Sequence, residues 1–321
     1  MKIVASEDPM IDVETIRDEL GPAASVETAD TASVEAVADA AADADGLVVG
    51  VGTPVTGAVL DACPELQVVA RAGVGIDNID VPAAAERDVT VANVPDYCTD
   101  EVATHTVALL LACVRSLGTY DRDVQSGGWD FAAGGEIHRL RTSTLGFLSF
   151  GPIARRVREQ VRGFDVDVVA HDPYVDAAEM AEHDVEAVSY GELLDRSTLL
   201  SVNAPLTEQT RGMVDADALA RLPDHAVVVN TGRGAVVDED ALAAALEDGE
   251  IAAAGLDVFA EEPPEQTPLL ERDDVFCTPH AAWYSVEARR DLNETVAANL
   301  RAVLVDGETP PGWVDPDLDW T

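Results

Sequence analysis

The feature that most constrains the fold is an alternation, repeated along the chain, between short runs rich in β-branched residues and Ala/Glu-rich stretches with helical periodicity. Strands that alternate with helices in this way predict βαβ units and a parallel sheet covered by helices. In the first third we expect strands at Lys2–Ala5, Gly46–Val51, Leu66–Ala70 and Val89–Ala92, and helices near Val13–Leu20, Val34–Ala41 and Val81–Arg87.

A second alternating series follows a long helical pattern, Thr99–Leu117, and a Gly-rich connection, Gly127–Thr142. At about 150 residues per domain, 321 residues suggest two domains. We therefore predict an α/β protein with two doubly wound parallel-sheet domains, Rossmann-like or flavodoxin-like. The expected elements of this second series are strands near Ser143–Ser149, Val166–His171, Thr198–Val202, Ala226–Asn230, Ile251–Leu256 and Val275–Thr278, and a final helix, Ser285–Leu304.

The charge balance excludes several classes of partner. Twenty basic against 61 acidic residues give a net charge of −41, which argues against binding to nucleic acid or to an anionic membrane. Such self-repulsion is screened in molar salt, where the Debye length is about 3 Å, so we infer a high-salt cytoplasm. The apolar run that precedes Ser6 is too short for a signal peptide, and the stretch Val107–Val114 is shorter than the roughly 20 residues of a membrane span.

The cysteines are far apart and form no C-x-x-C pair. We expect four reduced, buried thiols and no metal site, because metal ligands usually recur at short spacings. These residues are Cys63, Cys98, Cys113 and Cys277.

A candidate nucleotide loop, SFGPIA, joins a predicted strand to a predicted helix. Asp172, at the end of the next strand, lies where a carboxylate binds the ribose of a dinucleotide. Ser149 replaces the glycine of the tight turn, and Pro152 has no N–H for a phosphate. The alternative is a structural turn that binds nothing. The candidate cofactor residues are Ser149, Gly151, Pro152, Ile153 and Asp172.

Three candidate catalytic residues each follow a predicted strand: Arg233, Glu262 and His280. The carboxyl ends of parallel strands share one edge of a sheet, so these side chains are expected to converge. An imidazole can exchange the hydroxyl proton of a 2-hydroxy acid, a carboxylate can orient it, and a guanidinium can bind the substrate carboxylate through two hydrogen bonds. Taken singly, each has an ordinary explanation: a surface arginine, one of many acids and a structural histidine.

Longer motifs resemble a known family. The runs RAGVGIDNID, NVPDYCTDEVATH, NTGRGAVVDEDAL, GLDVFAEEPP and TPHAAWYS resemble those of D-isomer-specific 2-hydroxyacid dehydrogenases, in the usual order and across nearly the whole chain. The details DYCTDE and AAWYS resemble the branch that includes C-terminal binding protein.

The resemblance implies a domain organisation. Residues 1–98 and 282–321 would form a discontinuous substrate-binding domain and residues 99–281 a nucleotide-binding domain, with the active site in a cleft between them. It also implies a homodimer through the nucleotide-binding domain, with Trp129 and Phe131 as candidate contacts.

The resemblance also implies roles for individual residues. Arg233, Glu262 and His280 match its catalytic set. Asp172 favours NAD, because a carboxylate repels a 2′-phosphate, although the neighbouring His171 leaves NADP open. Further cofactor contacts would be Thr99, Thr231 and Asp257, and the amides of Val74 and Gly75 would bind the substrate carboxylate. Trp283 would line the substrate pocket, or else pack in the core, and Arg71 would add to carboxylate binding, or else pair with one of the many acids.

The expected function is NAD(H)-dependent interconversion of small 2-oxo acids and D-2-hydroxy acids, with His280 as the general acid/base. Two alternatives stay open: an NAD(H)-sensing, corepressor-like interaction protein with little turnover, and a D-3-phosphoglycerate dehydrogenase. The second is disfavoured because the chain ends without a regulatory domain and shows no basic cluster for a phosphate. His105 is expected to be a satisfied core or domain-interface histidine, and the other non-catalytic histidines to face solvent.

Overall fold

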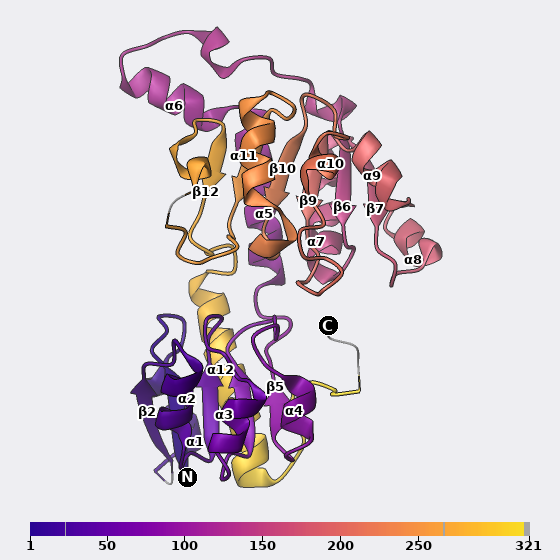
Figure 1. Ribbon diagram of the computed structural model, residues 1–321. Helices are drawn as coiled ribbons and strands as arrows, with labels where there is room; N and C mark the ends of the chain where they lie inside the picture. Colours follow the sequence, from indigo (N-terminus) through magenta and orange to yellow (C-terminus); the bar gives the residue numbers. More distant parts are fainter. Residues whose placement is uncertain (23, 266, 318–321) are drawn as a thin grey trace. The chain divides into compact units, whose positions relative to one another are not determined.

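The computed structural model describes residues 1–22, 24–265 and 267–317 (Figure 1). It divides into two compact units. Unit 1 contains Met1–Tyr97 together with the chain from Ser285, and unit 2 contains Cys98–Tyr284. Residues 318–321, at the end of the expected substrate-binding domain, lie outside the described residues.

Unit 1 is built on a five-stranded parallel sheet with the strand order β2-β1-β3-β4-β5. The order reverses between β1 and β3, and ligands of open α/β sheets bind beside the carboxyl ends of strands at such a switch point. The strands are β1 (Lys2–Ser6), β2 (Ser25–Ala29), β3 (Gly46–Val49), β4 (Val68–Arg71) and β5 (Thr90–Ala92). The helices are α1 (Val13–Leu20), α2 (Val34–Ala41), α3 (Gly57–Ala62), α4 (Val81–Ala85) and α12 (Val286–Arg301), the last followed by a π-helical turn, Ala302–Asp306.

Unit 2 contains a seven-stranded parallel sheet with the order β12-β11-β10-β9-β6-β7-β8 and helices on both faces (Figure 1). Its switch point lies between β6 and β9. The strands are β6 (Thr144–Leu148), β7 (Asp167–His171), β8 (Glu186–Ala187), β9 (Leu199–Val202), β10 (Val227–Asn230), β11 (Ala253–Leu256) and β12 (Val275–Cys277). The helices are α5 (Thr99–Val114), α6 (Leu117–Gln125), α7 (Pro152–Gln160), α8 (Ala177–Glu182), α9 (Tyr190–Arg196), α10 (Ala216–Leu219) and α11 (Glu239–Glu247).

The central strands are buried along their whole length. Every residue of β3, β4, β9 and β10 is buried. Because helices cover both faces of a parallel sheet, such strands read as continuous apolar runs rather than as alternating patterns. The predicted fold class, two doubly wound parallel α/β domains, is confirmed.

Some elements differ from the prediction. Strand β2 was not expected, because only Val26 of its five residues is buried and the segment lacks an apolar run. The predicted helix Thr99–Leu117 ends at Val114, and α6 starts at Leu117 in a direction bent by 61°. Ser116 lies between them in the left-handed conformation, with φ of 49°, which breaks the helix.

No single helix among the described residues is long and apolar enough to cross a membrane. Helices α5 and α6 meet the length and composition requirements only as a bent pair.

The expectation of four buried thiols is wrong for one of them. Cys63, Cys98 and Cys113 are buried, but Cys277, the last residue of β12, is exposed because β12 is the edge strand of its sheet. Burial raises the pKa of the Cys113 thiol to about 12. Within the described ranges, no three His, Cys, Asp or Glu side chains are grouped as metal ligands.

Two histidines are also less exposed than expected. His171 is half-buried, and its Nδ1 lies 3.0 Å from the carbonyl oxygen of Val188. His183 is half-buried against the edge of the Phe150 ring. His138 and His225 are exposed, as predicted.

Candidate active site

The three candidate catalytic residues follow three neighbouring strands of unit 2. Arg233 follows β10, Glu262 follows β11 and His280 follows β12. All three strands are parallel, so their carboxyl ends meet at one edge of the sheet. The strand order therefore brings the loops that carry Arg233, Glu262 and His280 to the same edge of the sheet, as expected.

A glycine brings the first two loops together. A Cβ atom on Gly234 would lie 1.9 Å from the carbonyl carbon of Phe259 and 2.1 Å from its oxygen, so only glycine fits without moving backbone. The Asn230 side chain fixes the same loop, because its Nδ2 donates to the carbonyl oxygen of Arg233 at 2.9 Å and its Oδ1 accepts the N–H of Gly232 at 3.0 Å. Sequence reasoning missed both positioning residues, although they flank Arg233 in NTGRG.

Glu262 and His280 form a hydrogen-bonded pair. Nδ1 of His280 lies 2.7 Å from Oε2 of Glu262, and Oε1 of Glu262 accepts the N–H of Phe259 at 3.0 Å. The side chains are 30% and 28% exposed for His280 and Glu262, respectively. The pair is thus shielded but accessible, and Nε2 of the imidazole is the ring nitrogen that remains for a substrate.

The pKa of Glu262 is lowered. Partial burial by itself raises the pKa of this carboxyl. The hydrogen bond from His280 and its charge, the N–H of Phe259 and the charge of Arg233 act in the opposite direction and together outweigh burial. Glu262 is therefore a carboxylate at neutral pH.

His280 has an unusual backbone conformation. Its φ of 50° lies in the left-handed region, and its N–H donates to the carbonyl oxygen of Asp257 at 2.8 Å and to that of Thr278 at 3.1 Å. Such a conformation costs on the order of 1 kcal/mol or more and persists where surrounding contacts enforce it.

The carboxylate of Asp257 supplies those contacts. This side chain is buried, and its two oxygens accept the N–H groups of Ala281 and Ala282, each at 2.9 Å. Oδ1 also accepts the Thr278 hydroxyl at 2.6 Å. Asp257, expected as a cofactor contact, thus holds the residues on both sides of His280.

His105, on α5, completes this cluster. Its Nε2 lies 2.9 Å from the Thr278 hydroxyl and 3.6 Å from Oδ1 of Asp257. The single hydroxyl hydrogen of Thr278 goes to Asp257, so Nε2 of His105 must be the donor to Thr278. His105 is thus a satisfied, half-buried histidine, and its distance of 173 residues from Thr278 in sequence hid the contact.

The candidate nucleotide loop turns tightly between β6 and α7. Ser149 has a φ of 72°, which explains why glycine suits this position. Its hydroxyl donates to Oδ2 of Asp172 at 2.9 Å, and the N–H of Phe150 donates to the same oxygen at 2.8 Å. Asp172 therefore closes the turn from the end of β7.

The start of α7 fits an anionic group. Gly151 is the N-cap, has no side-chain hydrogen bond and faces open space. The N–H groups of Gly151, Ile153 and Ala154 donate to no protein acceptor within the described residues. Such groups, with the helix dipole, bind phosphate. Pro152 is exposed at the first helical position and supplies no N–H.

The arginines of α7 already have acidic partners. Arg155 pairs with Glu179 at 2.8 Å. Arg156 pairs with Glu159 at 2.7 Å and with Asp100.

The two remaining candidate cofactor residues lie near α5. Thr99 is its first residue and is half-buried. The Thr231 hydroxyl lies 2.8 Å from the hydroxyl of Thr106, which itself donates to the carbonyl oxygen of Val102 at 2.7 Å. This contact fixes the loop after β10 to α5.

In unit 1, the loop after β4 offers free amides. Gly73 has a φ of 143°, and a Cβ atom there would lie 2.2 Å from Nη1 of Arg71, so the turn requires glycine. Arg71 is buried and donates to the carbonyl oxygen of Ala72. The N–H groups of Val74 and Gly75 donate to no acceptor in the described part of the chain. Two adjacent N–H donors beside the guanidinium of Arg71 form an arrangement that can bind a carboxylate.

Trp283 lies next to the boundary of unit 2. It is half-buried, and its ring packs edge-on against Tyr284, with centroids 5.4 Å apart and planes at 83°.

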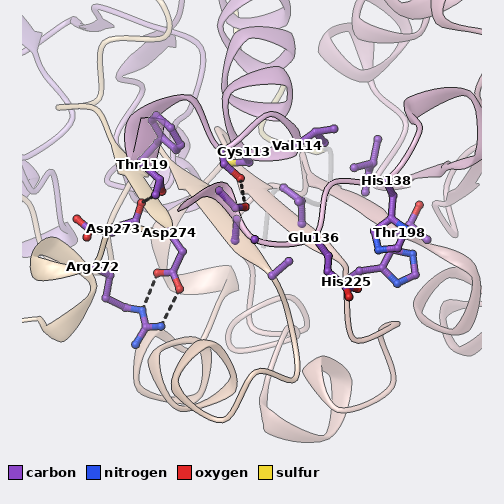
Figure 2. Close-up of a pocket in the computed structure, with 18 of the residues that line it drawn as sticks. Cys113, Val114, Thr119, Glu136, His138, Thr198, His225, Arg272, Asp273 and Asp274 are labelled. Carbon is purple, nitrogen blue, oxygen red and sulfur yellow. Dashed lines mark hydrogen bonds and ion pairs between the residues drawn. The ribbon is translucent and has the colours of Figure 1, made fainter. Parts of the chain in front are cut away.

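A cavity of unit 2 lies at the opposite edge of the sheet. Its volume is about 570 Å³, and residues that precede strands line it, among them Ser143, Thr198 and Asp274 (Figure 2). The rings of His138 and His225 lie on its wall, with centroids 4.4 Å apart and planes tilted by 40°. This cavity lies away from the carboxyl ends that carry Arg233, Glu262 and His280, so we do not assign the catalytic chemistry to it.

Comparison with known proteins identifies the family. Residues 107–282 match the family model described as "D-isomer specific 2-hydroxyacid dehydrogenase, NAD binding domain". A glyoxylate reductase of Korarchaeum cryptofilum is 38% identical over 283 residues, which cover 86% of this chain and 84% of the relative. The chain belongs to the D-isomer specific 2-hydroxyacid dehydrogenase family.

Other members of this dehydrogenase family are also similar. The chain is 40% identical over 277 residues to a D-3-phosphoglycerate dehydrogenase of Mycobacterium leprae but spans only 52% of its length. A crystal structure of D-lactate dehydrogenase from Aquifex aeolicus, complexed with NAD and lactic acid, superposes with a TM-score of 0.87 at 26% identity and covers 97% of this chain and 98% of that one. The matched residues 107–282 include Arg233, Glu262 and His280.

Proposed function

We propose that this dehydrogenase interconverts small 2-oxo acids and D-2-hydroxy acids with NAD(H), and that His280 is its general acid/base. The observation that carries the proposal is the 2.7 Å hydrogen bond between His280 and Glu262, at the sheet edge that Arg233 shares. The D-lactate dehydrogenase and the glyoxylate reductase named above support this substrate class.

The three residues have complementary roles. Nε2 of His280 donates a proton to the carbonyl oxygen of a 2-oxo acid, or accepts one from the hydroxyl in the reverse direction. Glu262 holds the imidazole through Nδ1 and balances its charge. Arg233 binds the substrate carboxylate with its planar guanidinium. NAD(H), when bound, accepts or supplies the hydride.

Unit 2 is the proposed nucleotide-binding domain. The amides of Gly151 and Ile153 would hold the pyrophosphate and Asp172 the ribose. Thr99, Thr231 and Asp257 are proposed as further contacts. Asp172 favours NAD, since its carboxylate repels a 2′-phosphate and the arginines of α7 already pair with acids.

Unit 1 is the proposed substrate-binding domain. The free amides of Val74 and Gly75 and the guanidinium of Arg71 would bind a substrate carboxylate. Trp283, which belongs to unit 2, is proposed as a further substrate contact. The pair Trp283–Tyr284, with the run DYCTDE, supports a place in the branch that includes C-terminal binding protein.

Replacement of His280 tests the function. His280→Ala should lower kcat by roughly 10² to 10⁴ with NADH binding retained, because positioned proton transfer contributes about that much. His280→Asn is the matched variant, since asparagine tolerates a positive φ and separates loss of the imidazole from backbone strain. A near-wild-type rate in either variant would refute the role.

A spectrophotometric assay of NADH oxidation also distinguishes an enzyme from an NADH-sensing interaction protein. A corepressor-like protein would bind NADH without useful turnover, whereas this proposal requires NADH oxidation with at least one small 2-oxo acid. The intact pairing of His280 with Glu262 favours the enzyme.

We further propose a homodimer formed through unit 2. Trp129 and Phe131, on the segment that follows α6, are 90% and 91% exposed, and a monomer rarely leaves two neighbouring aromatic side chains in water. Replacement of both by serine should shift the mass measured by light scattering from dimer to monomer. An unchanged mass would refute this contact.

A high-salt cytoplasm is the proposed environment. The net charge of −41 is tolerated where salt screens it. The melting temperature should therefore rise from 0.1 M to molar KCl, and a constant value would contradict this proposal.

A further inference from the structure

The switch point of the unit 1 sheet is filled by a carboxylate. Asp8 follows β1 and Gly50 follows β3, the two strands between which the order reverses. A Cβ atom on Gly50 would lie 2.0 Å from Oδ2 of Asp8 and 3.0 Å from its Cγ. The side chain of Asp8 thus fills the space beside residue 50, where an open α/β sheet ordinarily receives a ligand.

Asp8 is held in place. Its Oδ1 accepts the N–H of Met10 at 3.0 Å, and its own N–H donates to the carbonyl oxygen of Ser6 at 2.8 Å. The facing loop is fixed as well, because Nδ2 of Asn78 donates to the carbonyl oxygens of Gly50 at 3.0 Å and of Thr53 at 2.6 Å. The carboxylate cannot move away without loss of these contacts.

Buried hydroxyl groups fix the same edge. The Thr53 hydroxyl lies 2.8 Å from that of Ser6 and 2.9 Å from that of Thr31, and all three residues are buried. Ser6 donates to the carbonyl oxygen of Val48 at 3.2 Å, so Thr53 must donate to Ser6 and Thr31 to Thr53. This chain of hydrogen bonds joins the ends of β1, β2 and β3.

The carboxyl edge of unit 1 carries one cation and several acids. Arg71, at the end of β4, is the only basic residue that stands at this edge in the described part of unit 1. The other basic residues lie at the start of β1 or on and beside helices: Lys2, Arg17, Arg87, Arg289, Arg290 and Arg301. The acids that follow its strands are Glu7, Asp8, Asp30, Asp77 and Asp96.

We propose, on the basis of the function given above, that the substrate is a 2-oxo acid whose carboxylate is its single anionic group, and that Asp8 excludes 2-oxo acids with a phosphate or a second carboxylate. Arg71 and the amides of Val74 and Gly75 provide for one carboxylate. A second anion directed toward the switch point meets Asp8 and finds no basic side chain there among the described residues of unit 1. The specificity therefore resembles that of a glyoxylate or lactate enzyme rather than that of a phosphoglycerate enzyme.

The size of the effect follows from the strand spacing. Neighbouring strands are about 4.8 Å apart, and β3 separates β1 from β4, so Asp8 lies roughly 10 Å from the loop after β4. At an effective dielectric constant of about 20, repulsion over that distance weakens binding roughly tenfold for each negative charge. A phosphate, with nearly two charges, should be disfavoured by about 100-fold.

The experiment compares hydroxypyruvate with its phosphate ester, which differ only in the second anion. The enzyme is assayed as the full chain at the lowest salt that keeps it folded, and the ratio of the two kcat/KM values is the readout. The wild-type ratio should favour hydroxypyruvate by about 100-fold. Asp8→Asn, which keeps the acceptor for Met10, should lower the ratio by about the same 100-fold, because it removes the repulsion of both phosphate charges.

Asp39→Asn is the matched control. Asp39 is exposed on α2, which returns from the carboxyl to the amino edge, so its loss removes the same charge at a distance and should leave the ratio unchanged. Equal or better turnover of the phosphate ester by the wild type overturns the inference, and so does an Asp8→Asn ratio that matches the control. Absence of NADH oxidation with every 2-oxo acid refutes the proposed function itself, and the inference with it.

Discussion

The contact between Gly234 and Phe259 allows the positioning of Arg233 to be tested apart from its chemistry. In Gly234→Ala, the new methyl group would start 1.9 Å from the carbonyl carbon of Phe259. Ordinary contact begins at 3.4 Å, so the loops after β10 and β11 must separate by about 1.5 Å. The loop after β11 carries Glu262, whose Oε1 is bonded to the N–H of Phe259.

Two consequences follow from this displacement. A misplacement of about 1 Å in a catalytic site can lower the rate about 100-fold, so kcat/KM should fall by at least that factor. Overpacking of this kind costs about 1–3 kcal/mol of unfolding free energy, which is less than the total stability of a typical domain. The variant should therefore fold, with a lower urea midpoint.

The assay combines kcat/KM for a small 2-oxo acid, NADH binding by fluorescence and urea unfolding. NADH binding should weaken far less than kcat/KM falls, because the proposed pyrophosphate loop at Ser149 and Gly151 follows β6, on the far side of β9 from β10. Gly163→Ala is the control, since a Cβ atom there meets no atom within 4 Å. If Gly234→Ala retains kcat/KM within threefold of that control, the close approach does not position the catalytic residues.

Three further predictions concern the same unit. Arg233→Lys should raise KM for the 2-oxo acid by roughly tenfold or more, because lysine lacks the planar fork, and an unchanged KM would mean that the carboxylate is bound elsewhere. Pro152→Arg should lower the Kd for NADH in a fluorescence titration, since it restores an N–H at the start of α7 and adds a positive charge; an unchanged Kd would mean that the missing N–H does not limit binding. Glu262→Gln should destabilise the protein near neutral pH and progressively less in acid. The pKa of Glu262 is below its usual value in the folded state, so the carboxylate stabilises the fold above the unfolded pKa of about 4.3, and this contribution is lost as the pH falls through the folded pKa. Urea unfolding from pH 7 to pH 3 measures this, and a difference between variant and wild type that grows in acid would contradict it.

The sequence predicted best what depends on local patterns. Buried parallel strands such as β9 and β10 are apolar along their whole length, so their positions were found within a residue or two. Candidate catalytic residues were found because polar side chains that end such strands must share an edge. These inferences need no knowledge of long-range contacts.

What the sequence did not show depends on partners far along the chain. The contact of His105 with Thr278 and the filling of the space beside Gly50 by Asp8 join residues that no local pattern relates. The break at Ser116 depends on a single left-handed residue inside an otherwise helical pattern. The polarity of β2 reflects its position at the sheet edge, which only the assembled topology determines.

The carboxylate of Asp257 ends one strand and fastens the peptide groups that follow the next. The segments after β11 and after β12 consequently form one structural unit. A TPHAAW segment grafted from another protein would lose its hydrogen bonds to Asp257 unless the aspartate and its surroundings were transferred too. Attempts to alter substrate preference by loop exchange should therefore move both segments together, or leave both untouched and vary the other unit.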